Sequence, residues 1–363
     1  MIVRGHIADL LETTPALRAL RDRYPQSHVT AMVNEYTRGV LDDCPYVDRV
    51  IYGFTYERRT RWQRVTELAR LAASIFGRFD IVICERSAPP RAAGLALISG
   101  ARIRVGFDQP RIWGRLLTHN LGPQPDDLPN REVNLIPLRS LGIEGRPEYE
   151  PLSWIRPDVV ESVERLLRRS GITPGETGYA VYQVSCNWGC NELRSDKWAA
   201  VMDAVHRTHG LQPVVLGSGD SFELAKFDGI RELTSDAPTS LLGETTLPEA
   251  FEVVRGASLA VMTDSALGQV AIAQGVPTVL IFGVEPLVLT APLGSELDRT
   301  ALIQHWDPET ADPPNPHCRF GESYCHSEHC RENSSLVRTG VEEIVSKVAV
   351  VVRSRVPADS VNG

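Results

Sequence analysis

The chain has 363 residues, too many for one ordinary domain, and its length alone suggests two domains with three as an upper limit. Hydrophobic residues make up 42%, enough to fill a core in each half, and 23% charged residues with a formal net charge of −8 describe an ordinary soluble protein. The acidic balance argues against nucleic acid as the main partner, because proteins that bind phosphate backbones usually carry a basic excess.

The sequence favours a cytoplasmic location. The opening residues MIVRGHIADLL lack the charged region, apolar core and cleavage site of an export signal. No apolar run approaches the roughly 18 residues needed to cross a bilayer, so no transmembrane segment is expected, while peripheral contact with a membrane stays open. Seven cysteines without a secretory signal predict reduced thiols.

Short apolar runs alternate with amphipathic stretches in the first half. Residues 1–4 predict a clipped strand, and a helix is expected from about Leu10, with Thr13 and Thr14 before Pro15 as start signals. Strands are then expected at 28–33, 49–53, 79–85 and 102–107, with the clearest helix at 60–78. Strands separated by helices predict βαβ units and a parallel sheet.

The stretch 122–157 is rich in proline and glycine and predicts an interdomain linker with a short helix around 131–141. Domains are therefore expected at 1–157 and 158–363, and whether the final helix packs back on the first domain stays open. In the second half, strands are expected at 179–185, 213–219, 258–264 and 277–283, and helices near 195–209, 247–256, 266–274 and 341–355.

Ordered motifs along the chain resemble one family. The segment ADLLETTPALRALRDRYPQSHVTAMV, followed by CPYVDRVI and FDIVICERSAPPRAAGLALISGARIRVGF, is similar to the opening half of glycosyltransferase family 9, the ADP-heptose:lipopolysaccharide heptosyltransferases. The later segment LLGETTLPEAFEVVRGASLAVMTDSALGQVAIAQGVPTVLIFG resembles the donor-binding block of that family. The resemblance implies an α/β fold of the GT-B type, with two Rossmann-like parallel-sheet domains facing a central cleft. It also implies that the donor nucleotide binds the C-terminal domain and the acceptor the N-terminal one.

Asp9 is the candidate catalytic residue. It follows the clipped strand and precedes a helix, so it is expected at the carboxyl end of the sheet. The resemblance implies that it acts as general base, taking the proton of an acceptor hydroxyl. The alternative role is an N-cap of the following helix. The family glycine before this aspartate is Ala8 here, which restricts the backbone if a positive φ is needed.

Asp264, Ser265, Ala266 and Gln269 form the expected donor end, where a strand ends and a helix begins. The amides and dipole of a helix N-terminus suit a diphosphate, and the alternative is ordinary strand-to-helix punctuation. Ala266 and Gln269 stand where the family usually has glycine and histidine. Gln269 is expected to donate a neutral hydrogen bond in place of a charged one.

Further donor contacts are expected from three segments before that turn. Ser185, Asn191 and Arg194 align with the phosphate-gripping loop of the family, in which Asn191 falls near the usual lysine. Arg194 either compensates by forking onto the diphosphate or is an exposed arginine in the first turn of a helix. Two further pairs are expected to approach the nucleotide, the first because glycine lets the backbone come close and the second by the resemblance: Gly217 with Gly219, and Gly243 with Thr245.

Two clusters have less defined roles. Arg58, Arg59, Arg61 and Arg64 are expected either to receive an acidic acceptor or to form a solvated face. Cysteines 318, 325 and 330 alternate with histidines, but their spacings do not form the paired short knuckles of a common zinc site. A structural or incidental role is favoured over zinc, and the resemblance implies catalysis without a metal or other cofactor.

The sequence therefore predicts an inverting glycosyltransferase that moves a heptose or related sugar from an ADP-sugar to a carbohydrate acceptor. The acceptor is either the lipopolysaccharide inner core or a small natural product such as an aminoglycoside or nucleoside. The missing family cations at positions 191 and 269 favour the small molecule. The alternatives are a catalytically silent relative that binds a sugar nucleotide, or a sugar-nucleotide epimerase or hydrolase on the same fold.

Overall fold

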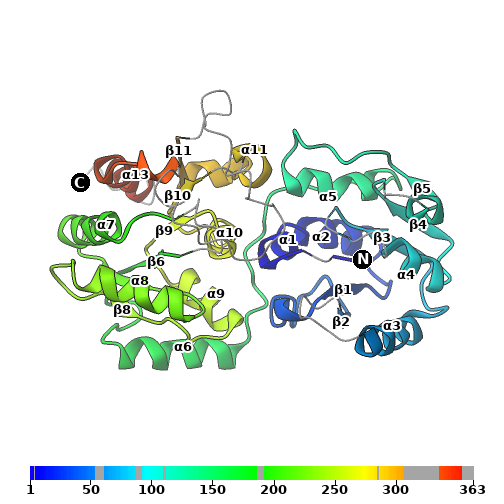
Figure 1. The fold of residues 1–363 in the computed structure, drawn as a ribbon, viewed down its shortest axis with the longest axis horizontal. Helices are drawn as coiled ribbons and strands as arrows, with labels where there is room; N and C mark the ends of the chain where they lie inside the picture. Colours follow the sequence, from blue (N-terminus) through cyan, green and yellow to red (C-terminus); the bar gives the residue numbers. More distant parts are fainter. Residues whose placement is uncertain are drawn as a thin grey trace. The chain divides into compact units, whose positions relative to one another are not determined.

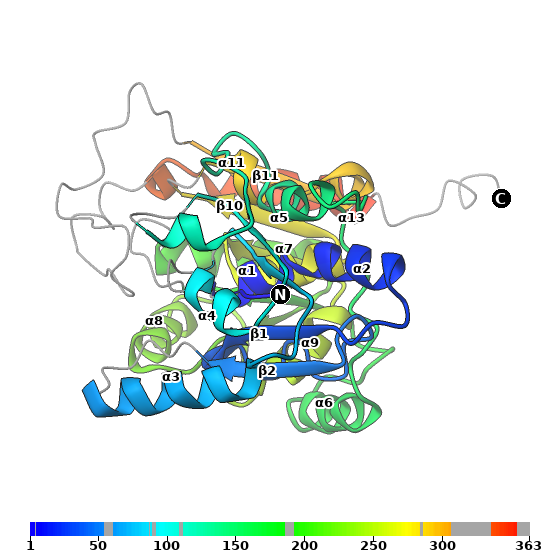
Figure 2. The same cartoon turned by 90° about the vertical axis from the view of Figure 1, so that its right-hand side faces the viewer.

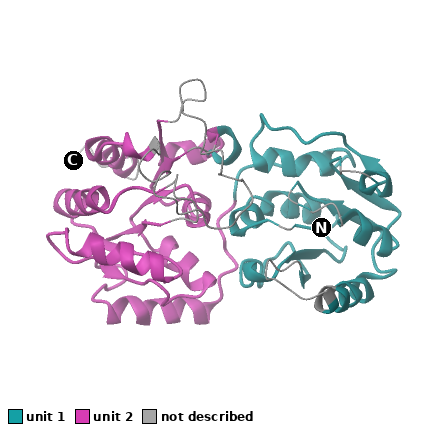
Figure 3. Ribbon diagram, in the orientation of Figure 1, with its two compact units in different colours: residues 1–149, 288–291 teal, residues 150–287, 292–363 magenta. Residues whose placement is uncertain are grey.

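The computed structural model describes residues 1–3, 5–53, 61–86, 88, 92–108, 112–185, 192–283, 286–305 and 335–353, without the side chains of residues 61, 63, 64, 67 and 335. The chain divides into two compact units, coloured separately in Figure 3. The N-terminal unit comprises residues 1–149 with 288–291, and the C-terminal unit comprises 150–287 with 292–363. The boundary lies at residue 150, inside the expected linker but before the expected boundary at 157.

The N-terminal unit alternates short strands and helices (Figure 1). Its elements are α1 (Ile7–Leu11), α2 (Thr14–Arg23), β1 (Thr30–Asn34), the 3₁₀ helix η1 (Glu35–Thr37), β2 (Arg49–Gly53), α3 (Arg61–Ile75), β3 (Ile81–Cys84), α4 (Ala92–Ile98), β4 (Ile103–Gly106), η2 (Trp113–Leu116), β5 (His119–Asn120), α5 (Asn130–Arg139) and α11 (Leu287–Thr290). The expected single helix near Leu10 is two helices, and Pro15 lies in the first turn of the second.

Residues 1–3 join the two halves of the N-terminal sheet. Ile2 forms parallel bridges to Met32 in β1 and to Cys84 in β3. The N–H of Ile2 donates to the carbonyl of Ile83 at 2.8 Å, and that of Val3 donates to the carbonyl of Met32 at 2.9 Å. The clipped strand is therefore reduced to one bridge residue. The sheet runs β2, β1, residues 1–3, β3, β4, β5, the strand order of a Rossmann fold.

Helices cover both faces of this sheet. Because successive side chains of a strand point to opposite faces, Ile83 packs with α2 and α5, whereas its neighbours Val82 and Cys84 pack with α3 and α4. α3 lies beside the end of β2 in both views (Figures 1 and 2). A Cβ added at Gly53 would lie 2.9 Å from the Leu71 side chain of α3. The sheet is thus enclosed on two sides, and its strand ends remain for polar groups.

The C-terminal unit repeats the same plan. Its elements are α6 (Pro157–Arg169), β6 (Tyr179–Gln183), α7 (Ser195–His209), β7 (Gln212–Val215), α8 (Ser221–Arg231), β8 (Thr239–Ser240), α9 (Leu247–Arg255), β9 (Leu259–Thr263), α10 (Ala266–Ala273), β10 (Thr278–Phe282), η4 (Gly294–Arg299), β11 (Thr300–Gln304), η5 (Ser335–Val337) and α13 (Val341–Arg353). Its strands pair in parallel in the order β8, β7, β6, β9, β10, β11, again that of a Rossmann fold.

One face of the second sheet is covered by α7, α8 and α13. Trp198 and Met202 of α7, Phe227 of α8 and Ile344 of α13 belong to one buried apolar cluster with the strands. The final helix therefore packs within the C-terminal unit. The ammonium of Lys197 donates to the carbonyls of Leu336, Val337 and Thr339, which fixes the turn before α13 on α7.

Candidate functional site

The catalytic candidate lies at the carboxyl edge of the N-terminal sheet. Ligands of Rossmann folds bind where the strand order reverses, here between residues 1–3 and β3. Asp9 follows the first of these segments, and Arg86 follows the second. The fold brings the two side chains together as an ion pair between Arg86 Nη2 and Asp9 Oδ1.

Asp9 is the third residue of α1, and His6 is the N-cap, so the alternative of Asp9 as N-cap is wrong. The Asp9 carboxylate still serves the helix start, because the backbone N–H of His6 donates to its Oδ2 at 2.6 Å. Its side chain is 20% exposed and so is open to a ligand. Ala8 lies in the helix, and among the described non-glycine residues only Asp43 has a positive φ, so Ala8 imposes no strain.

Gly5 leaves the space that Asp9 occupies. A Cβ at position 5 would overlap Cβ, Cγ and Oδ2 of Asp9. The Tyr36 hydroxyl donates to the Gly5 carbonyl at 3.0 Å, which holds the turn in place. The requirement for glycine therefore falls four residues before the carboxylate, not at position 8.

A buried carboxyl group stands behind the ion pair. Arg86 Nη2 donates to Glu12 Oε2 at 2.9 Å, and Asn130 Nδ2 donates to Glu12 Oε1 at 3.2 Å. Burial raises the pKa of Glu12 to about 8, against the opposing effects of Arg86 and the Asn130 amide. Sequence reasoning missed both residues. Two signals were available: Arg86 ends a strand at the same edge as Asp9, and Glu12 lies three residues after Asp9.

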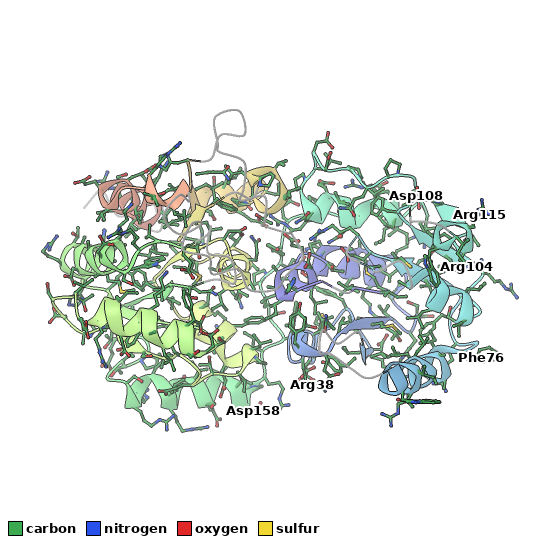
Figure 4. The ribbon with its side chains drawn as sticks, in the orientation of Figure 1. Arg38, Phe76, Arg104, Asp108, Arg115 and Asp158 are labelled. Atoms are coloured by element: carbon green, nitrogen blue, oxygen red, sulfur yellow. The ribbon has the colours of Figure 1, made fainter. Side chains whose placement is uncertain are left out.

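The expected acceptor arginines fall largely outside the described residues. This applies to Arg58 and Arg59, whereas Arg61 and Arg64 lie in α3 with undescribed side chains. An exposed arginine that the sequence did not single out, Arg38, follows β1 at the Asp9 edge (Figure 4).

Arg38 is held in place from two sides. It forms an ion pair with Glu35, and its guanidinium lies 4.0 Å from the centroid of the Tyr52 ring. Figure 4 shows Arg104 and Arg115 at the far end of this unit, away from α1. Arg38 is thus the better-placed described cation of these three for an acceptor near Asp9.

The expected donor residues gather at the carboxyl edge of the C-terminal sheet. The strand order reverses between β6 and β9, and Ser185 follows β6 while Asp264 and Ser265 follow β9. The glycine pair at 217 and 219 follows β7, and Gly243 and Thr245 follow β8. These segments share one edge because all the strands are parallel. Asn191 lies outside the described residues.

The start of α10 is arranged for an anion. Ser265 is the N-cap, and its hydroxyl accepts from the N–H of Gly268 at 3.2 Å. The first helical residue, Ala266, is half-buried and leaves the first-turn amides approachable. Gln269 is 1% exposed on the inner side of the helix, so its amide does not face solvent.

Two glycine turns meet at the same edge. The N–H of Gly243 donates to the carbonyl of Gly217 at 3.1 Å, and Gly219 and Gly243 both have a positive φ, of 74° and 72°. A Cβ on Gly219 would lie 2.7 Å from Gly243 N. The buried Glu223 carboxylate, which the sequence did not reveal, accepts from Gly219 N at 2.7 Å and Ser218 Oγ at 2.8 Å. It holds the first turn in shape.

Arg194 occupies the N-cap position of α7 and is 66% exposed. Its guanidinium forks onto Asp196, with Nε 3.0 Å from Oδ1 and Nη2 3.3 Å from Oδ2. A second cation lies near in space to Glu192, the first described residue after position 191: the largely buried Lys226 ammonium is 3.5 Å from the Glu192 carboxylate. The sequence had not singled out Lys226.

Metal ligands are not grouped in the described part of the chain. Within the described ranges, histidine, cysteine, aspartate and glutamate side chains form no cluster that could hold a metal ion. The cysteine and histidine cluster at 317–330 lies outside these ranges. Burial raises the pKa of the Cys84 thiol to about 12 and that of Cys44 to about 11, which disfavours thiolate chemistry at both. No described helix is long and apolar enough to span a membrane.

Comparison with known proteins identifies the class. Residues 177–313 match the model of glycosyltransferase family 9 (heptosyltransferase). Lipopolysaccharide heptosyltransferase 3 of Escherichia coli is 24% identical over 317 residues, which cover 84% of this chain and 88% of the relative. The chain is a heptosyltransferase-like glycosyltransferase.

Solved structures agree on the fold of this glycosyltransferase. A family 9 glycosyl transferase from Veillonella parvula has a TM-score of 0.78 at 18% identity and covers 97% of this chain and 96% of its own. The E. coli ADP-heptose lipopolysaccharide heptosyltransferase II has a TM-score of 0.68 at 18% identity, with 97% and 98% covered. The fold is of the GT-B type, as the sequence predicted.

Proposed function

We propose that this glycosyltransferase transfers a heptose or a closely related sugar from an ADP-sugar to a hydroxyl of a carbohydrate acceptor, with inversion at the anomeric carbon. The observation that carries the proposal is the Asp9 carboxylate, held by one backbone N–H and one guanidinium yet partly exposed, at the switch point of the first sheet. Arg86 places a fixed positive charge beside this carboxylate.

In this mechanism Asp9 takes the proton of the acceptor hydroxyl while the oxygen attacks the anomeric carbon. A C–O bond to the acceptor forms, the bond from the anomeric carbon to the diphosphate breaks, and ADP leaves with the electron pair. Attack opposite the leaving group inverts the configuration. We propose that no metal is required, because the amides at the start of α10 offer hydrogen-bond donors and positive charge to the departing diphosphate.

The donor is assigned to the C-terminal unit. The amides at the start of α10, beside Asp264 and Ser265, suit the diphosphate, because they offer donors and the positive end of the helix dipole. Backbone at Gly217, Gly219 and Gly243 allows close approach of the nucleoside. The E. coli structural neighbour is an ADP-heptose enzyme, which supports an ADP-sugar as donor.

The acceptor is assigned to the N-terminal unit and to the lipopolysaccharide core. The sequence favoured a small molecule, but a relative that matches 84% of the chain is named for lipopolysaccharide, which favours a core sugar. Arg38 beside Asp9's edge supplies an exposed guanidinium for acidic groups of such an acceptor.

The test follows ADP release from ADP-heptose with a core oligosaccharide lacking its outer heptose, with an aminoglycoside, and with no acceptor. We expect release that requires the core acceptor, persists in EDTA, and falls by about 10³-fold in Asp9→Asn, as for loss of a general base. Release with the aminoglycoside alone would transfer the proposal to small molecules. Release without any acceptor would indicate a hydrolase.

Asp48 provides a matched control for the aspartate variant. Its carboxylate also accepts one backbone N–H, from Val29 at 2.6 Å, and one guanidinium, from Arg21 at 2.6 Å. It directly precedes β2 and so lies at the opposite, amino edge of the sheet. Asp48→Asn is expected to lower stability and leave kcat unchanged. Equal kcat in Asp9→Asn and wild type would remove Asp9 from the mechanism.

A further inference from the structure

A continuous polar chain runs from helix α5 to the Asp9 carboxylate. Asn130 at the start of α5 donates to Glu12, and the same Arg86 nitrogen contacts both Glu12 and Asp9. Exposure decreases inward along this chain, from 20% for the Asp9 side chain to 15% for Arg86 and 2% for Glu12. A second amide from α5, that of Asn134, donates to the Glu12 carbonyl at 3.0 Å.

One guanidinium faces three carboxyl groups in this cluster. Besides Asp9 and Glu12, Glu85 Oε1 lies 3.8 Å from Arg86 Nε. Burial alone would lower the pKa of Arg86, but the surrounding carboxylates raise it, so this side chain stays charged. Since buried like charges repel, the cluster favours a proton on one carboxyl group, and burial raises the pKa of Glu12, whose side chain is 2% exposed.

We propose that Arg86 and Glu12 are positioning residues for the general base. Arg86 holds the Asp9 carboxylate in one orientation, and Glu12, anchored by Asn130 of α5, holds Arg86. This inference rests on the proposed role of Asp9 as base. A carboxylate held from one side by the His6 N–H and from the other by Arg86 keeps one orientation, which spares the reaction the entropy of ordering it.

The arrangement also couples the base to the state of Glu12. While Glu12 is protonated, Asp9 is the charged partner of the shared Arg86 nitrogen. When Glu12 ionises near its pKa of about 8, it competes with Asp9 for that nitrogen and adds a second negative charge beside it. The charged groups that act on the Glu12 carboxyl group are Arg86 and Asp9, and α5 contributes the neutral amide of Asn130 to it.

Three variants of the full-length enzyme test the inference. Arg86→Gln is expected to lower kcat by about 100-fold, as for misplacement of a reacting group, with an unchanged KM for ADP-heptose. Arg86→Lys keeps a charge but not the fork, and is expected to recover about tenfold of that loss. Glu12→Gln is expected to remove a rise of kcat, about threefold in wild type, between pH 7 and 9.

Arg21→Gln is the matched control, because Arg21 is 17% exposed in its pair with Asp48, close to the 15% of Arg86. It is expected to lower the melting temperature without changing kcat or its pH profile. Hydrogen exchange in peptides of residues 1–149 corrects each kcat for the folded fraction of the N-terminal unit, and calorimetric ADP binding, which reads the other unit, is expected to stay unchanged.

The outcomes separate the two proposals. Full activity of Asp9→Asn overturns the function of Asp9 itself. The positioning role alone is overturned if Asp9→Asn is inactive while the separate variants Arg86→Gln and Glu12→Gln keep kcat within twofold of wild type. In that case Glu12→Gln would also keep the wild-type pH profile of kcat. Equal losses in Arg86→Gln and Arg21→Gln would reduce Arg86 to a structural residue and overturn it as well.

Discussion

Replacing Glu12 by glutamine is expected to change how stability depends on pH. Glu12 has an ordinary pKa of 4.5 when unfolded and about 8 in the folded chain. Between these values the folded state binds one proton more than the unfolded state, so the free energy of unfolding of wild type falls as pH rises. At about 1.4 kcal/mol per pH unit, the full interval corresponds to about 5 kcal/mol. Glutamine does not titrate, so the variant avoids this loss.

The measured quantity is the free energy of unfolding of Glu12→Gln minus that of wild type, which is expected to grow by about 2 to 4 kcal/mol between pH 5 and pH 7.5. A constant offset from the amide cancels in this comparison. Urea titration read by hydrogen exchange in peptides of residues 1–149 isolates the N-terminal unit, because two-domain chains do not unfold in one step.

Glu249→Gln serves as the control with the opposite sign. Burial acts to raise the pKa of Glu249, but hydrogen bonds from Ser162 and Thr246 leave this pKa lowered. The stability that Glu249 contributes is therefore fully present above its unfolded pKa of 4.5 and is lost only at lower pH. Because Glu249 lies in the C-terminal unit, its variant is read in peptides of residues 150–283, and its difference from wild type should stay nearly constant from pH 6 to 7.5. A flat difference for Glu12→Gln as well would show that Arg86 keeps Glu12 ionised, and would refute the reasoning.

Three further changes follow from the geometry. Gly5→Ala places a Cβ on the Asp9 side chain and should lower kcat by about 100-fold with unchanged ADP binding, measured by ADP release and calorimetry. Gly219→Ala forces a side chain onto a φ of 74°, and should lower the free energy of unfolding by about 1 to 3 kcal/mol and weaken ADP binding. Arg194→Gln should raise the Kd for ADP by about tenfold if the Arg194 guanidinium exchanges Asp196 for the diphosphate when ADP binds. An unchanged Kd would show that Arg194 does not contact ADP.

Most of the fold was predictable from the sequence because strands and helices alternate and differ in hydrophobic periodicity. Every strand expected from 28–33 to 277–283 is present, with bounds shifted by a few residues. α6 escaped notice because Pro157 closes the proline-rich stretch and also begins the helix. α8 escaped because its sequence buries little apolar surface beyond Phe227 and Ile230.

The edge positions of the candidate residues were predictable, but their partners were not. Parallel pairing dictates that groups after β6, β7, β8 and β9 share an edge, so position along the chain was enough. The contact of Arg86 with Asp9 joins residues 77 positions apart, and Glu12 fills a variable position of the motif. The helical and strand periodicity of the sequence does not predict such a contact. Only the assembled sheet shows which side chains meet.

The N-terminal sheet depends on a narrow join, since residues 1–3 alone connect the β2–β1 pair with the β3–β4–β5 group. A disturbance at Ile2 would let these two groups part locally while each kept its own hydrogen bonds. Helix α1, which carries Asp9, follows this join in the chain, whereas Arg86 belongs to the other side. Efforts to make the enzyme more heat-resistant are therefore best directed at the contacts of Ile2, where added cohesion would preserve activity and structure together.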